Sequence, residues 1–439
     1  MENSKFFTTF QNKLESILMP VSQKLSEQRH LAAIRDAMTI LIPLTIIGGF
    51  SILLAQPPVD PTTITGSNIF YKFLLAWYDW ANANANILFI PYNLTLGAIS
   101  LYVVGAVAYR LSERYQLPKL EMCFTAILVY LCIGAAPQTL EEGTFMPIAN
   151  LGAGGMFTAI IIAIVVVEIT HLFIKNDITI KLPASVPPNV ASPFKVLIPM
   201  AVNVVGFLLL NVLCTNLTGG GICDLLMNLI QPLFSASESL PSILFLLLVS
   251  LTFWFFGIHG DNMVNAVVAP ITTMGVALNL EAYQAGKPMT HIFAGQFNGV
   301  WGTWLCYIAL LIAMILVCKS QQLRSLCKLA PLSTAFNINE PLVFGVPTVL
   351  NIFTFIPTMI CTILNISVAY AFTYFNIIGK TYLVLPWTTP APLAAFLSTM
   401  DVKALILWCV LLVIDVLILI PFIKNYDKQL LMEEKGEEK

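Results

Sequence analysis

Long apolar runs constrain the fold of this chain more than any other feature of its sequence. A helix needs about 20 mostly apolar residues to cross the hydrocarbon core of a bilayer. Nine segments qualify, at residues 31–54, 88–109, 121–137, 153–174, 196–216, 242–258, 299–318, 350–374 and 404–423. A tenth segment, 262–280, is less apolar. Only 10% of the residues are charged, against about 25% in soluble proteins. The chain is therefore predicted to be an all-α polytopic membrane protein.

The positions of lysine and arginine predict the orientation of the spans, because short cytoplasmic loops collect basic residues. Basic residues gather before residue 36 and in segments 110–119, 175–195, 319–328 and 424–439. Loops 138–152 and 217–241 contain none, and loop 56–86 has only Lys72. This alternation requires segment 262–280 to cross as well. It predicts ten spans, with both termini on the cytoplasmic side. The first thirty residues are charged and mostly polar, which indicates no cleavable signal peptide and predicts a bacterial inner-membrane protein that inserts through its own spans.

The chain is expected to divide into two halves with a short segment at each end. Residues 1–30 have apolar positions at helical spacing and predict an amphipathic helix on the cytoplasmic face, with a disordered tail as the alternative. A proline-rich linker, 181–195, follows the fourth span. Residues 31–217 are interpreted as a scaffold half and residues 218–425 as a half that builds a site, each with five spans. The charged end, 426–439, is predicted to be a cytoplasmic tail.

The first candidate functional segment is WFFGIHGDN, residues 254–262, where glycines interrupt an apolar run and ionisable side chains follow. A charge at the bilayer centre costs at least about 2.5–3.5 kcal/mol, so such groups persist where they are paired or serve a pathway. His259 is therefore a candidate functional residue. The alternative is a histidine at a helix end in the membrane interface.

The second segment is NINEPLVFGVP, residues 337–347. Its two prolines and one glycine prevent a continuous span and predict a re-entrant hairpin. The turn would place Asn337, Asn339 and Glu340 beside exposed backbone polar groups, as in the broken helices of transporters. The alternative, a surface loop carrying Glu340, fits poorly with the apolar residues on either side.

The third segment is LPWTTPAP, residues 385–392, which is too rich in proline for a helix and too apolar for an ordinary loop. Trp387 beside threonine hydroxyls would make a platform for a sugar ring, although a tryptophan of the membrane interface is the alternative. A carboxylate, an imidazole, several amides and aromatic rings together suit a neutral polyhydroxylated ligand.

Other ligand classes find no matching pattern in the sequence. No phosphate-binding loop or arginine cluster occurs in the second half, and no basic tract indicates nucleic acid. The four histidines are far apart, and no His/Cys/Asp group has the spacing of metal ligands in sequence. The nine cysteines are interpreted as packing residues. The sequence thus predicts no metal and no cofactor.

Six short motifs, in order along the chain, resemble one family. They are EQRHL at 27–31, AIRD at 33–36, VPPNV at 186–190, FGIHG at 256–260, NINEP at 337–341 and PWTTP at 386–390. Together they resemble enzyme IIC, the membrane component of the phosphoenolpyruvate-dependent sugar phosphotransferase system, in its lactose/cellobiose (N,N′-diacetylchitobiose) branch. The resemblance covers nearly the whole chain.

The resemblance implies a homodimer that associates through the first half, and a sugar site in the second half closed by re-entrant hairpins. It implies uptake of a β-linked disaccharide coupled to its phosphorylation by a phosphocysteine on a separate IIB protein, with IIA, HPr and enzyme I upstream. The family's essential His and Glu fall on His259 and Glu340, and its ring-stacking tryptophans on Trp254 and Trp387. Glu340 is expected to orient the sugar 6-hydroxyl and accept its proton, while His259 bonds neighbouring hydroxyls.

One segment departs from the family pattern. Residues 296–304 read QFNGVWGTW, so that Trp301 and Trp304 stand where small residues are expected. Asn298 in this segment is a further candidate sugar ligand. Because no IIB-like segment is recognised, the chain is not expected to turn over phosphate alone.

Two other functions remain open at the level of the sequence. The first is an ion-coupled secondary sugar transporter, in which His259, Asp261 and Glu340 would form a coupling relay. The second is a membrane protein that binds sugar without moving it.

Overall fold

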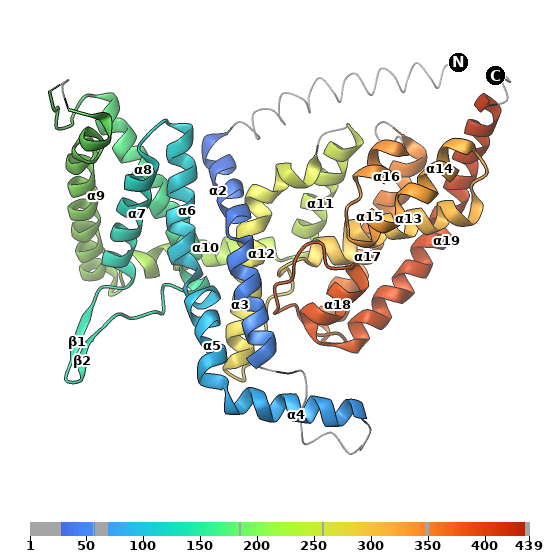
Figure 1. Ribbon diagram of the computed structural model, residues 1–439, viewed down its shortest axis with the longest axis horizontal. Helices are drawn as coiled ribbons and strands as arrows, with labels where there is room; N and C mark the ends of the chain where they lie inside the picture. Colours follow the sequence, from blue (N-terminus) through green and yellow to red (C-terminus); the bar gives the residue numbers. More distant parts are fainter. Residues whose placement is uncertain are drawn as a thin grey trace. The chain divides into compact units, whose positions relative to one another are not determined.

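The computed structural model describes residues 28–434 except 56, 58–68, 184–185, 257–258 and 347–350 (Figure 1). The predicted amphipathic helix at residues 1–30 therefore lies almost entirely outside the described residues, as does the end of the chain from residue 435. The described part is helical apart from one small hairpin, which confirms the predicted all-α membrane fold.

The chain forms two compact units. Of the described residues, one unit comprises 28–236 with 269–278, and the other comprises 237–268 with 279–434. The unit boundary lies after helix α10 (Ile222–Ser237), which occupies most of the segment interpreted from the sequence as loop 217–241. The roles of the halves, scaffold and transport, stay predictions.

The first unit is built mainly from long helices. They are α2 (Arg29–Ile40), α3 (Ile42–Ala55), α4 (Ile69–Ala83), α5 (Ala85–Leu94), α6 (Ile99–Arg114), α7 (Lys119–Gly134), α8 (Met156–Lys175) and α9 (Pro188–Thr218), besides α10. Strands β1 (Gln138–Leu140) and β2 (Gly143–Phe145) form an exposed antiparallel hairpin after α7. Helix α4 lies in a segment that was predicted to be a loop, and it runs across the direction of α3 and α5 (Figure 1).

The second unit mixes long helices with short ones. Its helices are α11 (Leu240–Phe255), α13 (Trp304–Val317), α14 (Gln321–Leu329), α15 (Pro331–Ala335), α16 (Glu340–Gly345), α17 (Ile352–Tyr374), α18 (Ala391–Thr399) and α19 (Val402–Glu434), with a π-helical turn, η3, at Gly299–Thr303. Helix α12 (Gly260–Gln284) contributes residues to both units. Prolines interrupt the apolar pattern at 337–347 and 385–392, as the sequence predicted, and short helices α16 and α18 begin there. The short helix α15 was not predicted.

The ten predicted spans are not all confirmed. Among the described residues, seven helices are long and apolar enough to cross a membrane, or nine if two bent helix pairs each count as one span. The pairs are α2 with α3, bent by 42°, and α10 with α11, bent by 72°. Segment 262–280 is confirmed as a candidate span, whereas α7 has only 16 residues. At about 1.5 Å per residue, α7 is shorter than the hydrocarbon core of about 30 Å.

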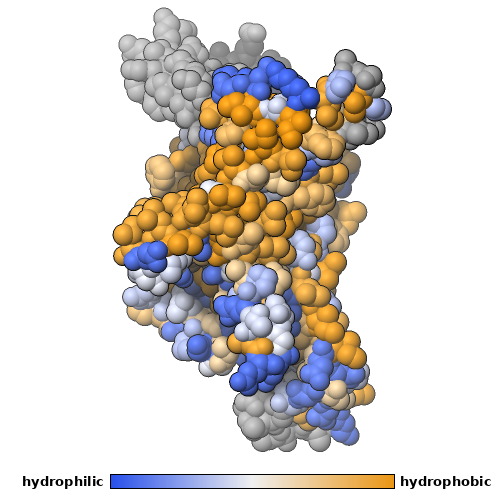
Figure 2. All heavy atoms as spheres, turned by 90° about the vertical axis from the view of Figure 1, so that its left-hand side faces the viewer, coloured by the Kyte–Doolittle hydropathy of each residue, from blue (hydrophilic) through white to orange (hydrophobic). Residues whose placement is uncertain are grey.

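Apolar side chains cover much of the outer surface. On α9, Leu209, Leu213 and Leu217 are exposed, and a broad hydrophobic area occupies the face seen in Figure 2. A soluble protein would not leave so large an apolar area in water. The finding supports a multi-pass membrane protein with a lipid-facing surface.

Helix α19 continues beyond its apolar run to Glu434, into the segment predicted to be a tail. Its polar end has partners on the chain. Both carboxylate oxygens of Asp427 accept the backbone N–H of Lys319, and Oδ1 also accepts that of Ser320, at 2.9–3.0 Å. Glu434 Oε1 accepts the N–H of Gln321 at 2.8 Å. These bonds satisfy backbone donors at the start of α14 and hold the charged end of α19 against it.

Candidate functional site

The break between α11 and α12 depends on Gly260. A Cβ atom at this position would lie 1.9 Å from the carbonyl oxygen of Ser250, so only glycine allows the start of α12 to approach α11. The next residue, Asp261, then reaches back to α11. Its Oδ1 accepts the Ser250 hydroxyl at 2.8 Å and its Oδ2 accepts Trp254 Nε1–H at 3.2 Å. The two helix ends are therefore connected by both close packing and hydrogen bonds.

His259 lies at this break, as the sequence predicted. Its ring centroid is 4.3 Å from that of Trp254, with the planes tilted by 45°. The His259 side chain is exposed, while Trp254 is half-buried and packs against the core cluster that contains Leu342 and Val343 of α16. Trp254, His259 and Asp261 thus form one group, in which the tryptophan contacts the imidazole and donates to the carboxylate.

Asn337 connects the second and third candidate segments. Its φ is +64°, a left-handed conformation that asparagine tolerates better than most residues. From this position its Nδ2 donates to the carbonyl oxygens of Trp387 and Thr389, both at 2.7 Å. The polar residues of 337–340 and the loop that carries Trp387 are therefore held side by side, although 50 residues separate them in sequence.

A second side-chain amide connects the loop to segment 296–304, the segment that differs from the family pattern. Gln296 Nε2 donates to the carbonyl oxygen of Leu385 at 2.7 Å. Gln296 and Asn337 therefore hold the backbone of 385–389 from two directions. The sequence predicts no role for Gln296, because neither its own position nor that of Leu385 carries a recognisable pairing pattern.

The base of the same loop is also fixed by polar contacts. Asn279 Nδ2 donates to the carbonyl oxygen of Thr381 at 2.8 Å. Lys380 Nζ donates to Asn376 Oδ1 at 2.6 Å, and burial lowers the pKa of this lysine. These contacts leave the aromatic side chain at the tip as the part of the loop that faces outward.

Trp387 has 48% of its surface exposed, although its backbone is fixed. An exposed indole on an anchored loop is a preorganised stacking surface, because little conformational freedom is lost when a ligand binds. Trp254 differs, since its ring is already in contact with His259.

Three predicted ligands share an unusual property. Asn298, Asn337 and Asn339 each have a buried side-chain oxygen, Oδ1, without a hydrogen-bond partner in the structure. Asn337 and Asn339 are 5% and 9% exposed. Buried polar atoms are usually hydrogen-bonded, and leaving one unpaired costs about 1–3 kcal/mol. The three acceptors lie in segments 296–304 and 337–347, which are hydrogen-bonded to the loop that carries Trp387. They are therefore suited to a ligand with hydroxyl donors.

Glu340 is the first residue of α16, directly after Asn339. The backbone N–H groups of Leu342 and Val343 donate to the Asn339 carbonyl oxygen at 2.9 and 3.0 Å, which forms the first turn. The side chain of Glu340 lies outside the described part of the chain, so its predicted role is not tested by its geometry.

The two tryptophans of segment 296–304, Trp301 and Trp304, pack inside the second unit. Trp301 is 2% exposed, and Trp304 covers Gly299, where a Cβ atom would lie 2.6 Å from the Trp304 ring. Trp408 of α19 donates its Nε1–H to the Val300 carbonyl oxygen at 3.1 Å. The extra aromatic volume is thus accommodated around the π-helical turn η3, a feature that often marks functional sites.

The chain is similar to several known proteins. The family model described as "Phosphotransferase system, EIIC" matches residues 35–362. The lactose-specific EIICB component of the phosphotransferase system from Staphylococcus haemolyticus is 30% identical over 433 residues, covering 95% of this chain and 70% of that protein. The corresponding protein from Lacticaseibacillus casei is 31% identical over 440 residues, covering 97% and 73%.

A solved structure is also similar. It is the crystal structure of the transporter ChbC, the IIC component of the N,N′-diacetylchitobiose-specific phosphotransferase system, with a TM-score of 0.86 and 30% identity. The match covers 97% of this chain and 100% of that one.

Proposed function

This chain belongs to the EIIC family of the phosphotransferase system, and we propose that it binds a β-linked disaccharide and carries it across the membrane. The substrate class is that of lactose, cellobiose and N,N′-diacetylchitobiose; lactose and N,N′-diacetylchitobiose are the substrates named for the similar proteins. We further propose that transport is coupled to phosphorylation by a separate IIB protein, and that the chain acts as a homodimer associated through residues 31–217.

The three unpartnered amide oxygens of Asn298, Asn337 and Asn339 carry this proposal. Sugar hydroxyls are donors that would satisfy them, and the exposed Trp387 offers a ring face for the apolar C–H surface of a sugar. Because the three oxygens are buried, a hydroxyl reaches them only if the surrounding segments shift. Binding is therefore expected to be accompanied by local movement of these segments.

The proposed reaction assigns separate roles to Glu340 and His259. The sugar 6-hydroxyl attacks the phosphorus of the IIB phosphocysteine; the new P–O bond forms as the P–S bond breaks, and the thiolate leaves with the electron pair. Glu340 accepts the hydroxyl proton, and His259 holds neighbouring hydroxyls so that the attack is aligned. Alignment is expected to dominate, since phosphoryl transfer depends mainly on positioning and charge stabilisation.

Replacing Glu340 separates binding from chemistry. Glu340→Gln keeps the shape and hydrogen-bonding capacity but cannot accept the proton. We expect phosphorylation of the sugar by phosphorylated IIB to fall about 100-fold or more, while the Kd for the sugar changes less than threefold. Glu433→Gln, on the exposed end of α19, is the matched control and should change neither. Equal losses of binding and phosphorylation in Glu340→Gln would contradict the catalytic role.

The substrate class is tested by a binding screen of β-linked disaccharides against the purified protein. Trp387→Ala is expected to weaken the best ligand by about 1–2 kcal/mol, or roughly tenfold. Trp80→Ala on α4, with a similar exposure of 49%, is expected to leave it unchanged. No binding of any β-linked disaccharide would refute the proposed substrate class.

Reconstituted vesicles distinguish this function from ion-coupled transport. We expect sugar phosphate inside vesicles only when phosphorylated IIB is present on the cytoplasmic side. Uptake of free sugar driven by a proton or sodium gradient, without a phosphate donor, would overturn the phosphotransferase mechanism.

A further inference from the structure

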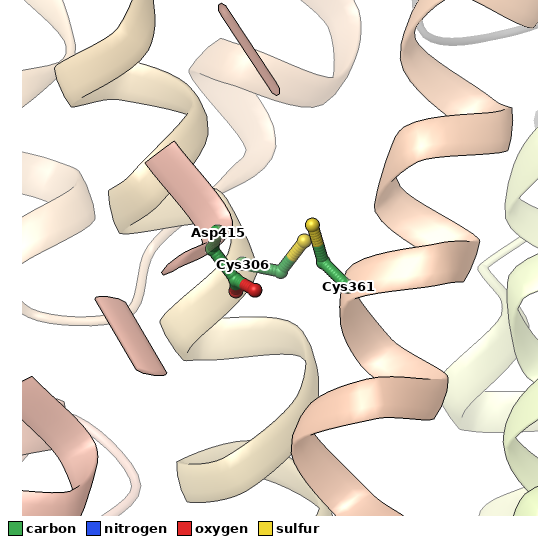
Figure 3. A group of neighbouring side chains, drawn as sticks. All are labelled: Cys306, Cys361 and Asp415. Atoms are coloured by element: carbon green, nitrogen blue, oxygen red, sulfur yellow. The ribbon is translucent and has the colours of Figure 1, made fainter. Parts of the chain in front are cut away.

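Three membrane-spanning helices of the second unit bring two thiols and a carboxylate together. Cys306 of α13, Cys361 of α17 and Asp415 of α19 are 1%, 0% and 0% exposed. Their ligand atoms, one from each residue, all lie within 4.8 Å of one another. Figure 3 shows the two sulfur atoms side by side, with the Asp415 carboxylate entering from α19.

The polar atoms of this cluster are incompletely satisfied. Asn365 Nδ2 donates to Asp415 Oδ2 at 2.7 Å, and Cys306 Sγ lies 3.7 Å from the Thr358 carbonyl oxygen, to which it donates. Asp415 Oδ1 and Asn365 Oδ1 are buried without a hydrogen-bond partner. An ionised carboxylate inside a protein costs several kcal/mol unless it is paired. Among the charged groups that the structure describes, no lysine or arginine forms an ion pair with Asp415.

We propose that Cys306, Cys361 and Asp415 form a binding site for a thiophilic divalent cation of the zinc type. Two thiolates and a carboxylate oxygen are ligands that Zn²⁺ accepts, whereas Mg²⁺ and Ca²⁺ prefer oxygen alone. Asn365 lies one helical turn after Cys361 on α17 and offers its unpartnered amide oxygen as a fourth ligand. The cation supplies the positive charge that the buried carboxylate lacks.

The sequence predicted no metal site because no candidate ligands lie close together in the chain. Here the ligands come from three helices, and 109 positions separate Cys306 from Asp415. A bound cation connects α13, α17 and α19 at one point inside the unit that carries the candidate sugar site. Since both thiols must lose their protons, metal affinity is expected to fall as the pH is lowered.

Cobalt substitution tests the proposal directly. The full chain, purified in detergent without a polyhistidine tag and treated with a chelator, is titrated with Co²⁺ and then with Zn²⁺. We expect about one bound ion per chain, a thiolate-to-cobalt charge-transfer absorption in the near ultraviolet, and loss of that absorption when Zn²⁺ displaces the cobalt. Mg²⁺ should not displace it.

Variants identify the ligands. Cys361→Ser and Cys306→Ser are expected to abolish the charge-transfer band, and Asp415→Asn to weaken Co²⁺ binding at least tenfold. Cys409→Ser, an exposed thiol on the same helix as Asp415, is the matched control and should bind normally. Folding of each variant is checked by its elution as a single species and by its thermal denaturation.

The proposal is overturned if the wild-type chain shows no thiolate-to-cobalt band, or if the band survives in both Cys306→Ser and Cys361→Ser. A disulfide between Cys306 and Cys361 in the chain purified under air-free conditions would also overturn it. These measurements are independent of transport activity, so they can fail while the proposed sugar function holds.

Discussion

At the residue scale, Asn337 combines a predicted sugar contact with an anchoring function that the sequence could not reveal. The sugar contact stays a prediction, and its Oδ1 has no hydrogen-bond partner among the described residues. Its Nδ2, however, holds the Trp387 loop through two carbonyl oxygens. This second function depends on a contact across 50 residues, and a single sequence contains no information about such a pairing.

Substitutions of Asn337 test the anchoring function. Asn337→Gly keeps the left-handed backbone but removes both hydrogen bonds, so we expect sugar affinity to weaken about tenfold. Asn337→Asp keeps the shape but sets a carboxylate against two carbonyl oxygens, so we expect a larger loss and a lower Tm. Calorimetric titration with the best disaccharide and thermal denaturation measure both effects. Wild-type affinity in Asn337→Asp would refute the anchoring function.

Gly260 makes a second prediction at this scale. The added methyl group of Gly260→Ala would overlap the Ser250 carbonyl oxygen, so the α11–α12 break must open and move Asp261 away from Trp254. We expect a stability loss of about 3 kcal/mol or more, together with weaker sugar binding.

The control for Gly260 is another buried helical glycine. A Cβ atom at Gly302 would meet its nearest neighbour, on Thr362, at 3.6 Å, an ordinary packing distance. Gly302→Ala is therefore expected to keep a Tm within a few degrees of the wild type. Similar Tm values for the two variants would contradict the steric reason given for Gly260.

At the scale of the helices, the apolar pattern predicted the long elements well and the short ones poorly. Segments 196–216 and 404–423 lie within α9 and α19, and segment 153–174 matches α8 from Met156 onward. Helices α4 and α10 were not predicted, because they mix polar and apolar residues and therefore form no continuous apolar run. The prolines of 337–347 and 385–392 correctly predicted breaks, since proline removes a backbone donor.

The connection between α19 and α14 yields a prediction for these elements. Asp427→Ala leaves the backbone donors of Lys319 and Ser320 without this acceptor, at a cost of about 1–3 kcal/mol for the buried donor of Ser320. We expect a lower Tm and faster hydrogen exchange confined to residues 319–329. Asp427→Asn keeps one acceptor oxygen and should lose less. Unchanged exchange in this segment would show that Asp427 does not hold the start of α14.

At the scale of the whole molecule, the sequence predicted two halves but placed their boundary by counting spans. The structure instead joins α10 to the first unit and divides α12 between the units. Periodicity and loop charge describe each helix separately and do not reveal which helices pack together. The change in polar content along the chain predicted two halves, whereas the membership of each compact unit required the structure. The proline-rich linker 181–195 lies inside the first unit and marks no boundary between units.

Whether helix α7 crosses the membrane determines the topology of the chain between α6 and α8. Its 16 residues are short for a bilayer, yet basic residues precede it and loop 138–152 has none. The charge pattern predicts that α7 crosses, with its ends extended by flanking residues or the bilayer locally thinned. Residues 116 and 144 should then lie on opposite sides of the membrane.

Accessibility to a membrane-impermeant thiol reagent in spheroplasts tests this topology. We expect Thr144→Cys, in the exposed hairpin, to react from outside, and Gln116→Cys to react only after permeabilisation. The unsubstituted chain, with its native cysteines, measures the background. If both positions react from the same side, α7 does not cross, and an odd number of crossings would place the two termini on opposite sides of the membrane. A reporter fused to each end would show that difference independently.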